Sequence, residues 1–209
     1  MARIGILGGT FNPPHLGHLA LARHALGELG LERVMLMPVH TPPHKPGGED
    51  PGPEHRLAMC RLAIQGEDGI EVCGLEMERG GPSYTADTLE EIHERHPEAE
   101  LTFIVGADTA ETLPSWHQPQ RVLELAELAV ASRSGVDHEL VDAAVVSAAG
   151  EGTAPAPRVR FLQMPQIEAS SSMARSLIEA GDGAERMLPA AVAGYIAEHR
   201  LYRGGGGLR

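Results

Sequence analysis

Two histidines three positions apart, His15 and His18, follow a glycine-rich turn near the start of the chain. The turn begins with Gly8 and Gly9, where backbone amides can approach an anion because no side chain intervenes. A helix predicted to start near Leu16 adds free N–H groups and the positive end of its dipole at the same place. A spacing of three puts both imidazoles on one face of the first helical turn. The segment therefore predicts a site for phosphate groups.

The spacing of this turn disfavours two common phosphate-binding loops. A dinucleotide fingerprint needs G-x-G-x-x-G, and a Walker loop needs Gly-Lys-Ser or Gly-Lys-Thr. Gly17, between the histidines, keeps the imidazole face open. The alternative interpretation is a glycine turn and a capped helix with two incidental histidines. A zinc site is disfavoured because neither a pair of thiolates nor an H-E-x-x-H motif accompanies them, so no metal ligands are predicted.

A run of serines after the last predicted strand supplies a second set of groups for phosphate. Ser170, Ser171 and Ser172 open a helix, and Arg175, one turn further, can bind phosphate oxygens bidentately. Ligands of open α/β sheets bind at the carboxyl ends of the strands, where both motifs are expected. Alone, the serines would indicate only a helix N-cap. Together with the histidines they indicate a site for a triphosphate.

The elements that position these motifs follow from the pattern of apolar residues. Apolar runs alternate with segments of helical periodicity, which is typical of βαβ units and a parallel sheet. The predicted fold class is α/β, a Rossmann-like open parallel sheet flanked by helices. Strands are predicted at 3–7, 34–37, 70–72, 101–105, 128–131 and 159–164, and helices at 16–29, 54–65, 85–95, 172–179 and 189–199. A Pro- and Gly-rich loop at 38–53 is long enough to suggest function, and 137–157 reads as a weak helix and a loop.

Size and charge restrict the classes of protein. The 209 residues predict one domain at 1–203, its last ~35 residues a helical C-terminal part, and a flexible tail at 204–209. The formal net charge is −12, but residues 1–48 carry four basic and two acidic residues and are net positive. This balance argues against broad nucleic-acid or anionic-membrane binding and leaves room for a compact anion near the N-terminus. Lys45, in the long loop, is the single lysine of the chain.

Compartment is indicated by the cysteines and by the lack of a long apolar run. Cys60 and Cys73 are two thiols in a chain that does not need disulfides, which fits a reducing compartment. The longest stretch without a charged residue, 4–22, is interrupted by Asn, Pro and His and cannot be a membrane helix. We therefore predict a cytoplasmic protein.

Several motifs occur together in the order found in one superfamily of enzymes. Gly-Gly-Thr-Phe-Asn-Pro-Pro-His-Leu-Gly-His at 8–18, with Ser-Ser-Ser-x-x-Arg at 170–175, resembles the H-x-G-H nucleotidyltransferases, which include class I aminoacyl-tRNA synthetases. Within that superfamily the chain is similar to the bacterial nicotinate-nucleotide adenylyltransferases. The further matching motifs span nearly the whole chain and are Thr-Pro-Pro-His-Lys at 41–45, Gly-Pro-Ser-Tyr-Thr-Ala-Asp-Thr-Leu at 81–89, Phe-Ile-Val-Gly-Ala-Asp at 103–108, Trp116, and Leu-Tyr at 201–202.

The serine motif departs from the pattern of this family, which usually reads Ile-Ser-Ser-Thr-x-Ile-Arg. Ala169, Ser172 and Ala174 stand where the family has isoleucine, threonine and isoleucine. The smaller alanines predict looser packing around Arg175. Ser172 preserves the hydroxyl group, so phosphate binding is still expected.

The resemblance implies a sheet of the nucleotidyltransferase type and a reaction between two small molecules. The 5′-phosphate of nicotinate mononucleotide would attack the α-phosphorus of ATP and expel pyrophosphate, giving nicotinate adenine dinucleotide. Mg²⁺ is implied as the cofactor that accompanies ATP. No covalent enzyme intermediate is needed, so catalysis consists of positioning the substrates and neutralising their charge. Neither nucleic acid nor membrane is expected as a partner, and homo-oligomer formation is left open.

The resemblance also assigns residues to each substrate. The catalytic set is His15, His18, Lys45 and Arg175. ATP would be bound by Gly8, Gly9, Thr10, Phe11, His15, His18, Gly106, Asp108, Ser171, Ser172 and Arg175. The mononucleotide would be bound by Thr10, Lys45, Thr85, Trp116 and His117, with the indole stacked on the pyridine ring. For His18 we expect only slight burial. Taken alone, Asp108 could be a helix N-cap and Trp116 a core residue.

Three other functions are considered. Another H-x-G-H enzyme, such as a pantetheine-phosphate adenylyltransferase or a glycerophosphate cytidylyltransferase, is disfavoured by the 81–85 motif and Trp116. A regulatory module that holds a nucleotide without turnover is disfavoured by the intact His15, His18, Lys45 and Arg175. An RNA-binding role is disfavoured because no basic domain is present.

Overall fold

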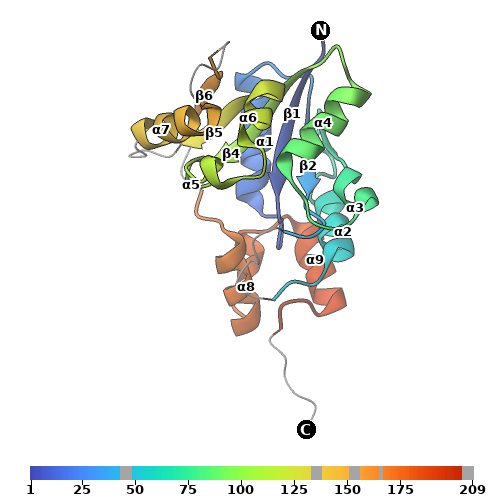
Figure 1. Cartoon of the computed structure of the whole chain (residues 1–209). Helices are drawn as coiled ribbons and strands as arrows, with labels where there is room; N and C mark the ends of the chain where they lie inside the picture. Colours follow the sequence, from blue (N-terminus) through green and yellow to red (C-terminus); the bar gives the residue numbers. More distant parts are fainter. Residues whose placement is uncertain (43–48, 133–137, 151–155, 165–166, 204–209) are drawn as a thin grey trace.

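One parallel sheet of six strands runs through the part of the chain that the computed structural model describes, residues 1–42, 49–132, 138–150, 156–164 and 167–203. The strand order is β3-β2-β1-β4-β5-β6. Figure 1 labels the strands of this order from β2 to β6. The strands are β1 (Arg3–Gly9), β2 (Arg33–Pro38), β3 (Ile70–Val72), β4 (Glu100–Gly106), β5 (Ala126–Ser132) and β6 (Val159–Gln163). The chain goes from β1 to one edge and then crosses to β4, so the order reverses between these two strands. Such a reversal is where open α/β sheets bind ligands.

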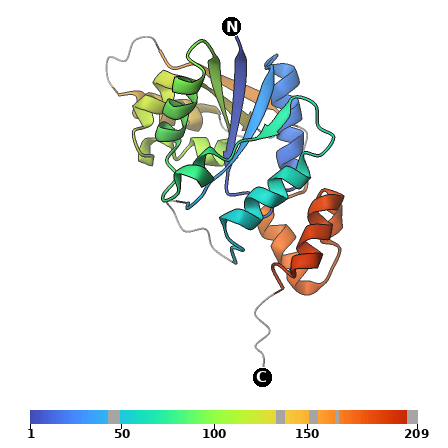
Figure 2. The same cartoon turned by 90° about the vertical axis from the view of Figure 1, so that its right-hand side faces the viewer.

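Helices cover both faces of the sheet (Figure 2). On one face α1 (Leu16–Glu28) and α2 (Pro53–Ala63) pack through Ala22, Ala25 and Cys60 against apolar side chains of the strands. On the other face apolar side chains of the following helices form a second core. These helices are α3 (Leu75–Arg79), α4 (Thr85–Arg95), α5 (Ala107–Ala110), η1 (Leu113–Ser115), α6 (Pro119–Leu125) and α7 (His138–Ala149).

The central strand β1 is an unbroken apolar run because helices cover both of its faces. Ile4, Ile6 and Leu7 are all buried. Gly5 allows close packing, since a Cβ atom there would lie 2.7 Å from Cδ1 of Leu31 and would displace that side chain. The strand thus carries Gly8 and Gly9 to the carboxyl edge of the sheet on a rigid support.

The last helices lie beyond the carboxyl ends of the strands, at the bottom of Figure 1. They are α8 (Ser171–Ala180), η2 (Ala184–Arg186) and α9 (Ala190–His199). Ala174, Val192 and Ile196 of these helices form a third apolar cluster with Leu19 of α1 and Met59 of α2. This packing brings the C-terminal part next to the ligand edge of the sheet. The division into one domain at 1–203 stays a prediction, and residues 204–209 lie outside the described part of the chain.

The predicted α/β class with an open parallel sheet flanked by helices is confirmed. Each predicted strand and helix is present within two residues at either end, and the weak helix within 137–157 is α7. Three short helices, α3, α5 and α6, were not predicted from the sequence. Their lengths are five, four and seven residues, too short to display a helical period.

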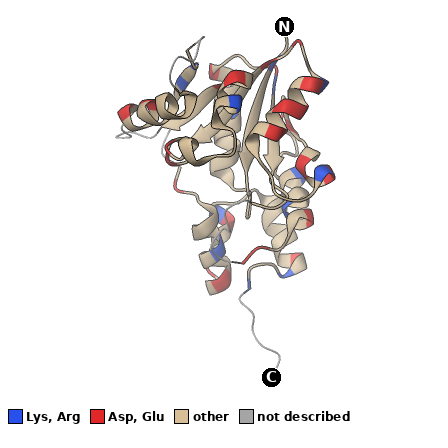
Figure 3. Cartoon of the chain, in the orientation of Figure 1, with Lys and Arg blue, Asp and Glu red and all other residues tan. Residues whose placement is uncertain are grey.

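Charged residues are spread over many elements, as Figure 3 shows. The acidic residues of α4 lie on its outer side, where Glu90 and Glu94 are exposed. None of the helices in the described residues is long and apolar enough to cross a membrane.

Candidate active site

The histidine turn, residues 8–18, joins β1 to α1 and places two imidazoles against each other. His15 is the N-cap of α1, and its ring stacks on that of His18 with 3.7 Å between centroids. Phe11 packs its edge against His18 at 4.8 Å. His15 is buried and His18 is half-buried, so the expected slight burial of His18 is wrong. The stacked neighbours cover most of its ring and fix its direction.

The protonation state of His18 follows from its contacts. The backbone N–H of His15 donates to Nδ1 of His18 at 3.2 Å. A nitrogen that accepts carries no hydrogen, so the neutral ring bears its hydrogen on Nε2. Burial and, second, repulsion from His15 lower the pKa of His18 well below its usual value. At neutral pH His18 is therefore an uncharged ring whose donor is Nε2–H.

The start of α1 offers fewer free amides than the sequence predicts. The N–H of Leu16 donates to the carbonyl of Met187 at 2.8 Å, and that of His18 donates to the carbonyl of His15 at 3.0 Å. The segment between α8 and α9 lies against the helix start and uses the first of these donors. The attraction for anions at this end thus depends more on the helix dipole and the imidazoles than on unbonded N–H groups.

Gly17 leaves room for the ring of His15. A Cβ atom at Gly17 would lie 3.0 Å from Cε1 and Nδ1 of His15 and 3.6 Å from the carbonyl oxygen of Ala169. The first distance is tighter than ordinary contact, so any side chain here must move the imidazole. The expectation that Gly17 keeps this face open has a steric basis.

We expect Gly17→Ala to lower turnover by about tenfold. The added Cβ atom would displace the His15 imidazole, which would then no longer meet the reacting phosphates in the same geometry. Gly27→Ala on the same helix is the matched control, since a Cβ atom there meets nothing within 4 Å. That substitution should keep wild-type turnover and stabilise the helix by about 0.5–1 kcal/mol. Steady-state kinetics measure the turnover and thermal melting the stability of the two variants. Equal turnover of the two variants would contradict the assignment of His15 to the site.

The serine motif docks on the histidine turn from the far end of the chain. The Ser170 hydroxyl accepts from the N–H of Met173 at 3.1 Å and caps α8. The Ser171 hydroxyl donates to the carbonyl of Pro13 at 2.9 Å, and Nη1 of Arg175 donates to the carbonyl of Asn12 at 2.7 Å. Ser172 is exposed. The two predicted phosphate motifs are therefore in direct contact.

Two cavities open at the carboxyl edge of the sheet, on either side of β1. The first, of about 390 Å³, lies beside α1 and the segment before α8. The second, of about 670 Å³, lies beside α4 and η1. Both are lined by Gly8, Gly9, Val105 and Thr109. Ligands in the two cavities would thus meet over the two glycines that end β1.

The predicted ligand residues separate between these cavities. The first is lined by residues assigned to ATP, namely Gly8, Gly9, His15, His18, Gly106 and Asp108. The second is lined by Gly8 and Gly9 and by residues assigned to the mononucleotide, namely Thr10, Thr85, Trp116 and His117. Thr10 was assigned to ATP as well but does not line the first cavity. Phe11, Ser171, Ser172 and Arg175 line neither, and Ser170 lines the first instead. Lys45 lies outside the described residues.

Comparison with known proteins places the chain in a family. The cytidylyltransferase-like family model matches residues 6–177. A probable nicotinate-nucleotide adenylyltransferase of Symbiobacterium thermophilum is 41% identical over 202 residues, which cover 97% of this chain and 96% of that protein. One of Thermomicrobium roseum is 40% identical over 204 residues, covering 97% and 92%. The chain belongs to the nicotinate-nucleotide adenylyltransferases of the cytidylyltransferase-like family.

A solved structure shares the fold of this family member. Plasmodium falciparum nicotinic acid mononucleotide adenylyltransferase complexed with NaAD has a TM-score of 0.78 and 18% sequence identity, with 97% of this chain and 98% of that chain covered. At this identity the likeness concerns the fold. It supports the nucleotidyltransferase type of sheet that the motifs imply.

Trp116 packs against the core and also lines the second cavity, and its stacking on a pyridine ring stays a prediction. Its ring is half-buried, lines the second cavity, and packs edge-on against Phe103 with 5.9 Å between centroids. Its Nε1–H donates to the Thr112 hydroxyl at 3.0 Å. One side of the indole thus rests on the core and its orientation is fixed. In this member of the family, an aromatic surface is available to a ring in the cavity.

Asp108 does not cap a helix in the structure. The N-cap of α5 is Gly106, so the interpretation of Asp108 as a helix cap is wrong. The Asp108 side chain is exposed and lines the first cavity. A Cβ atom at Gly106 would meet nothing within 4 Å, so no protein contact explains the glycine there.

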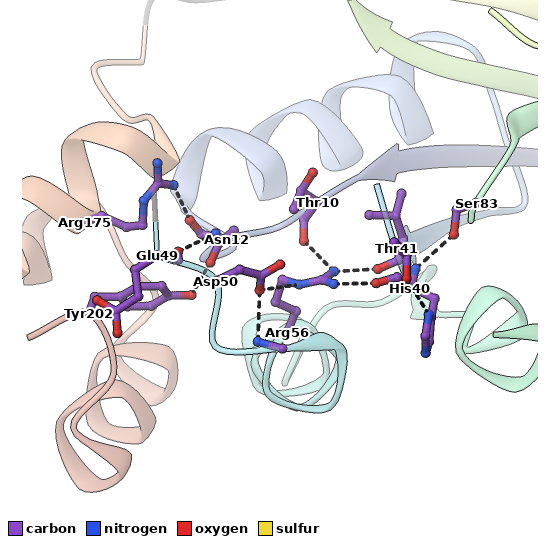
Figure 4. Close-up of polar contacts among 12 residues, drawn as sticks. Thr10, Asn12, His40, Thr41, Glu49, Asp50, Arg56, Ser83, Arg175 and Tyr202 are labelled. Carbon is purple, nitrogen blue, oxygen red and sulfur yellow. Dashed lines mark hydrogen bonds and ion pairs between the residues drawn. The ribbon is translucent and has the colours of Figure 1, made fainter. Parts of the chain in front are cut away.

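A buried arginine that the sequence analysis missed holds the strand ends together (Figure 4). Arg56 of α2 is completely buried and donates to the carbonyls of Thr10, Val39 and His40 and to Oδ1 of Asp50. Asp50 balances its charge at 3.0 Å, which a buried guanidinium requires. Its position on the apolar side of the helix, three and four residues before Met59 and Cys60, is the signal that could have revealed it.

A buried carboxyl group lies in the wall of the second cavity and was also missed. Glu76 of α3 is 5% exposed, and its Oε1 accepts from the Thr88 hydroxyl at 2.7 Å. Burial raises its pKa, against the hydroxyls of Ser83 and Thr88 and the guanidinium of Arg79. The residue sits in a helix too short to be predicted, so its burial carries no sequence signal.

Proposed function

We propose that this protein transfers the adenylyl group of ATP to nicotinate mononucleotide, releasing pyrophosphate and forming nicotinate adenine dinucleotide. The observation that carries the proposal is the pair of cavities that share Gly8 and Gly9, one lined by the ATP residues and the other by the mononucleotide residues. Two substrates so placed would bring the attacking 5′-phosphate and the α-phosphorus together over the glycines. The curated relatives named above carry the same activity in their names.

In this reaction the residues of the chain would stabilise the charge that develops during an in-line displacement at the α-phosphorus of ATP. Nε2–H of His18 is assigned to the α-phosphate oxygens, where negative charge develops. His15 supports that ring through their stacking contact. The dipole of α1 adds a favourable field at the same point. No side chain has to form a covalent bond with a substrate in this reaction.

The implied Mg²⁺ fits a site of this kind as a companion of ATP. Among the described residues no three His, Cys, Asp or Glu side chains gather closely enough to hold a metal ion. Mg²⁺ is commonly held by substrate phosphates, water and one or two carboxylates. The Asp108 carboxylate is the acidic group lining the first cavity. Bound there with ATP, the ion would neutralise charge on the leaving pyrophosphate.

The proposal is tested with a panel of acceptors. Purified protein, ATP and Mg²⁺ are mixed with nicotinate mononucleotide, nicotinamide mononucleotide, pantetheine phosphate or glycerol phosphate, and pyrophosphate release is followed. We expect nicotinate mononucleotide to give the highest kcat/KM, with the dinucleotide identified by mass. Faster release with pantetheine phosphate or glycerol phosphate would assign the chain to another nucleotidyltransferase. Tight ATP binding without release would assign it to a regulatory module.

Lys45 is expected to contribute to ATP use. As the single lysine of a proline-rich loop, it offers a point charge on a flexible stem that can follow a triphosphate. Lys45→Ala should raise the apparent KM for ATP by about tenfold at saturating mononucleotide. Lys45→Arg, which keeps the charge, is the control and should recover part of the loss. An unchanged ATP dependence in the alanine variant would remove Lys45 from the site.

A further inference from the structure

Asn12 connects three distant parts of the chain inside the histidine turn (Figure 4). Its side chain is 3% exposed. Nδ2 donates to the backbone carbonyl of Glu49 at 2.9 Å, Oδ1 accepts from the Tyr202 hydroxyl at 2.6 Å, and its backbone carbonyl accepts from Arg175 at 2.7 Å. These contacts involve both polar atoms of the Asn12 side-chain amide and the carbonyl oxygen of its backbone. Asn12 is therefore held by the end of the chain and by two elements of the ligand edge.

Tyr202 is built into this position with unusual backbone geometry. The residue is 2% exposed, follows α9, and has φ 60°, a left-handed conformation that is costly for a bulky side chain. Phe11, next to Asn12, has φ 50°. Burial, with the Asp50 charge second, raises the pKa of Tyr202, so its hydroxyl stays protonated and donates. Strained residues thus stand on both sides of the hydrogen bond.

The same turn carries the contacts of α8. Consecutive carbonyls, those of Asn12 and Pro13, accept from Arg175 and Ser171. His15 follows two residues later and stacks on His18. A shift of the Asn12 peptide group would therefore move the anchor of Arg175 and the start of α1 together.

We propose that Tyr202 is a positioning residue of the ATP half of the site, acting through Asn12 on Arg175 and the histidines. The inference rests on the proposed function, because it takes the first cavity as the ATP site. The hydroxyl matters more than the ring: phenylalanine would fill the same volume and leave Oδ1 of Asn12 buried without its donor. A buried acceptor without a donor is costly, and the side chain relieves that cost by moving.

The test is Tyr202→Phe in the full chain, with Tyr195→Phe as the matched control. Tyr195 also lies in the C-terminal helical part, but its hydroxyl pairs with Nδ1 of His55 at 2.9 Å, away from Asn12. We expect Tyr202→Phe to raise the KM and the Kd for ATP by roughly threefold to tenfold, the size of one lost hydrogen bond, with the KM for nicotinate mononucleotide unchanged. Tyr195→Phe should change neither constant.

A double variant separates positioning from a general loss of stability. If Tyr202 acts through Asn12, Tyr202→Phe has no further effect on ATP affinity once Asn12→Ala is present. An ATP affinity equal to wild type in Tyr202→Phe would overturn the inference. So would a fall in kcat with both KM values unchanged and a lower melting temperature, since that pattern indicates partial unfolding. A wild-type protein that binds ATP without forming the dinucleotide would refute the proposed function, and ATP affinity would still test Tyr202.

Discussion

Replacing His18 by alanine is expected to lower kcat with ATP and nicotinate mononucleotide by about 10²- to 10³-fold, the cost of one lost transition-state donor. The backbone of His15 fixes the tautomer of His18, and Phe11 and His15 fix its ring. The donor thus needs no reorientation when charge develops on the α-phosphate. The substrate KM values should change much less, because the contact is assigned mainly to the transition state.

His24→Ala is the matched control for this variant. His24 lies on the same helix and pairs with Glu28 at 2.6 Å, away from the cavities. It should keep wild-type kcat. Melting curves of both variants show whether the fold is intact; a small loss is expected for His18 because its ring is half-buried. The role assigned to His18 is wrong if the folded His18→Ala variant keeps a kcat within about threefold of wild type. Such a loss is far smaller than the cost of one lost transition-state donor.

A second large effect is expected in the choice of pyridine. The second cavity is lined by Thr85, the first residue of α4, so the positive end of that helix faces it. A carboxylate gains from this field, whereas a carboxamide presents an NH₂ donor to groups that also donate. We expect kcat/KM for nicotinate mononucleotide to exceed that for nicotinamide mononucleotide by about 100-fold.

Trp116→Ala separates ring stacking from recognition of the acid. Stacking contributes equally to the binding of both pyridines. This variant should therefore weaken the binding of both mononucleotides by about tenfold and leave the ratio of their kcat/KM values unchanged. Side-by-side steady-state kinetics on wild type and variant provide all four constants. Similar kcat/KM values for the two mononucleotides in wild type would contradict the acid preference. An unaltered mononucleotide KM in the variant would make Trp116 a core residue only.

The strands and the two motifs predicted to bind phosphate could be identified from the sequence because each is a pattern within a short stretch of chain. The apolar run of β1 and the glycines after it need no tertiary information to be recognised. The position of β1 at the reversal of strand order then places the motifs at the ligand edge.

The features that were missed depend on contacts between distant residues. Arg56 meets the ends of β1 and β2, and Tyr202 meets Asn12 across 190 positions of the chain. No periodicity in one segment reports such contacts. The burial of His18 was misjudged for a local reason, since the rings of Phe11 and His15 come against it only once the turn has folded. Ser171 was predicted to bind phosphate, which stays a prediction, and the donation of its hydroxyl to the Pro13 carbonyl is a long-range contact that the sequence did not reveal.

The fate of labelled phosphate in ATP tests the central claim most directly. The protein is incubated with nicotinate mononucleotide, Mg²⁺ and ATP labelled at either the α- or the γ-phosphate, and the products are separated. Adenylyl transfer predicts that the α label enters nicotinate adenine dinucleotide and the γ label leaves in pyrophosphate, in equal amounts. A γ label found on the mononucleotide or as free phosphate, with no α label in a dinucleotide, would contradict the account.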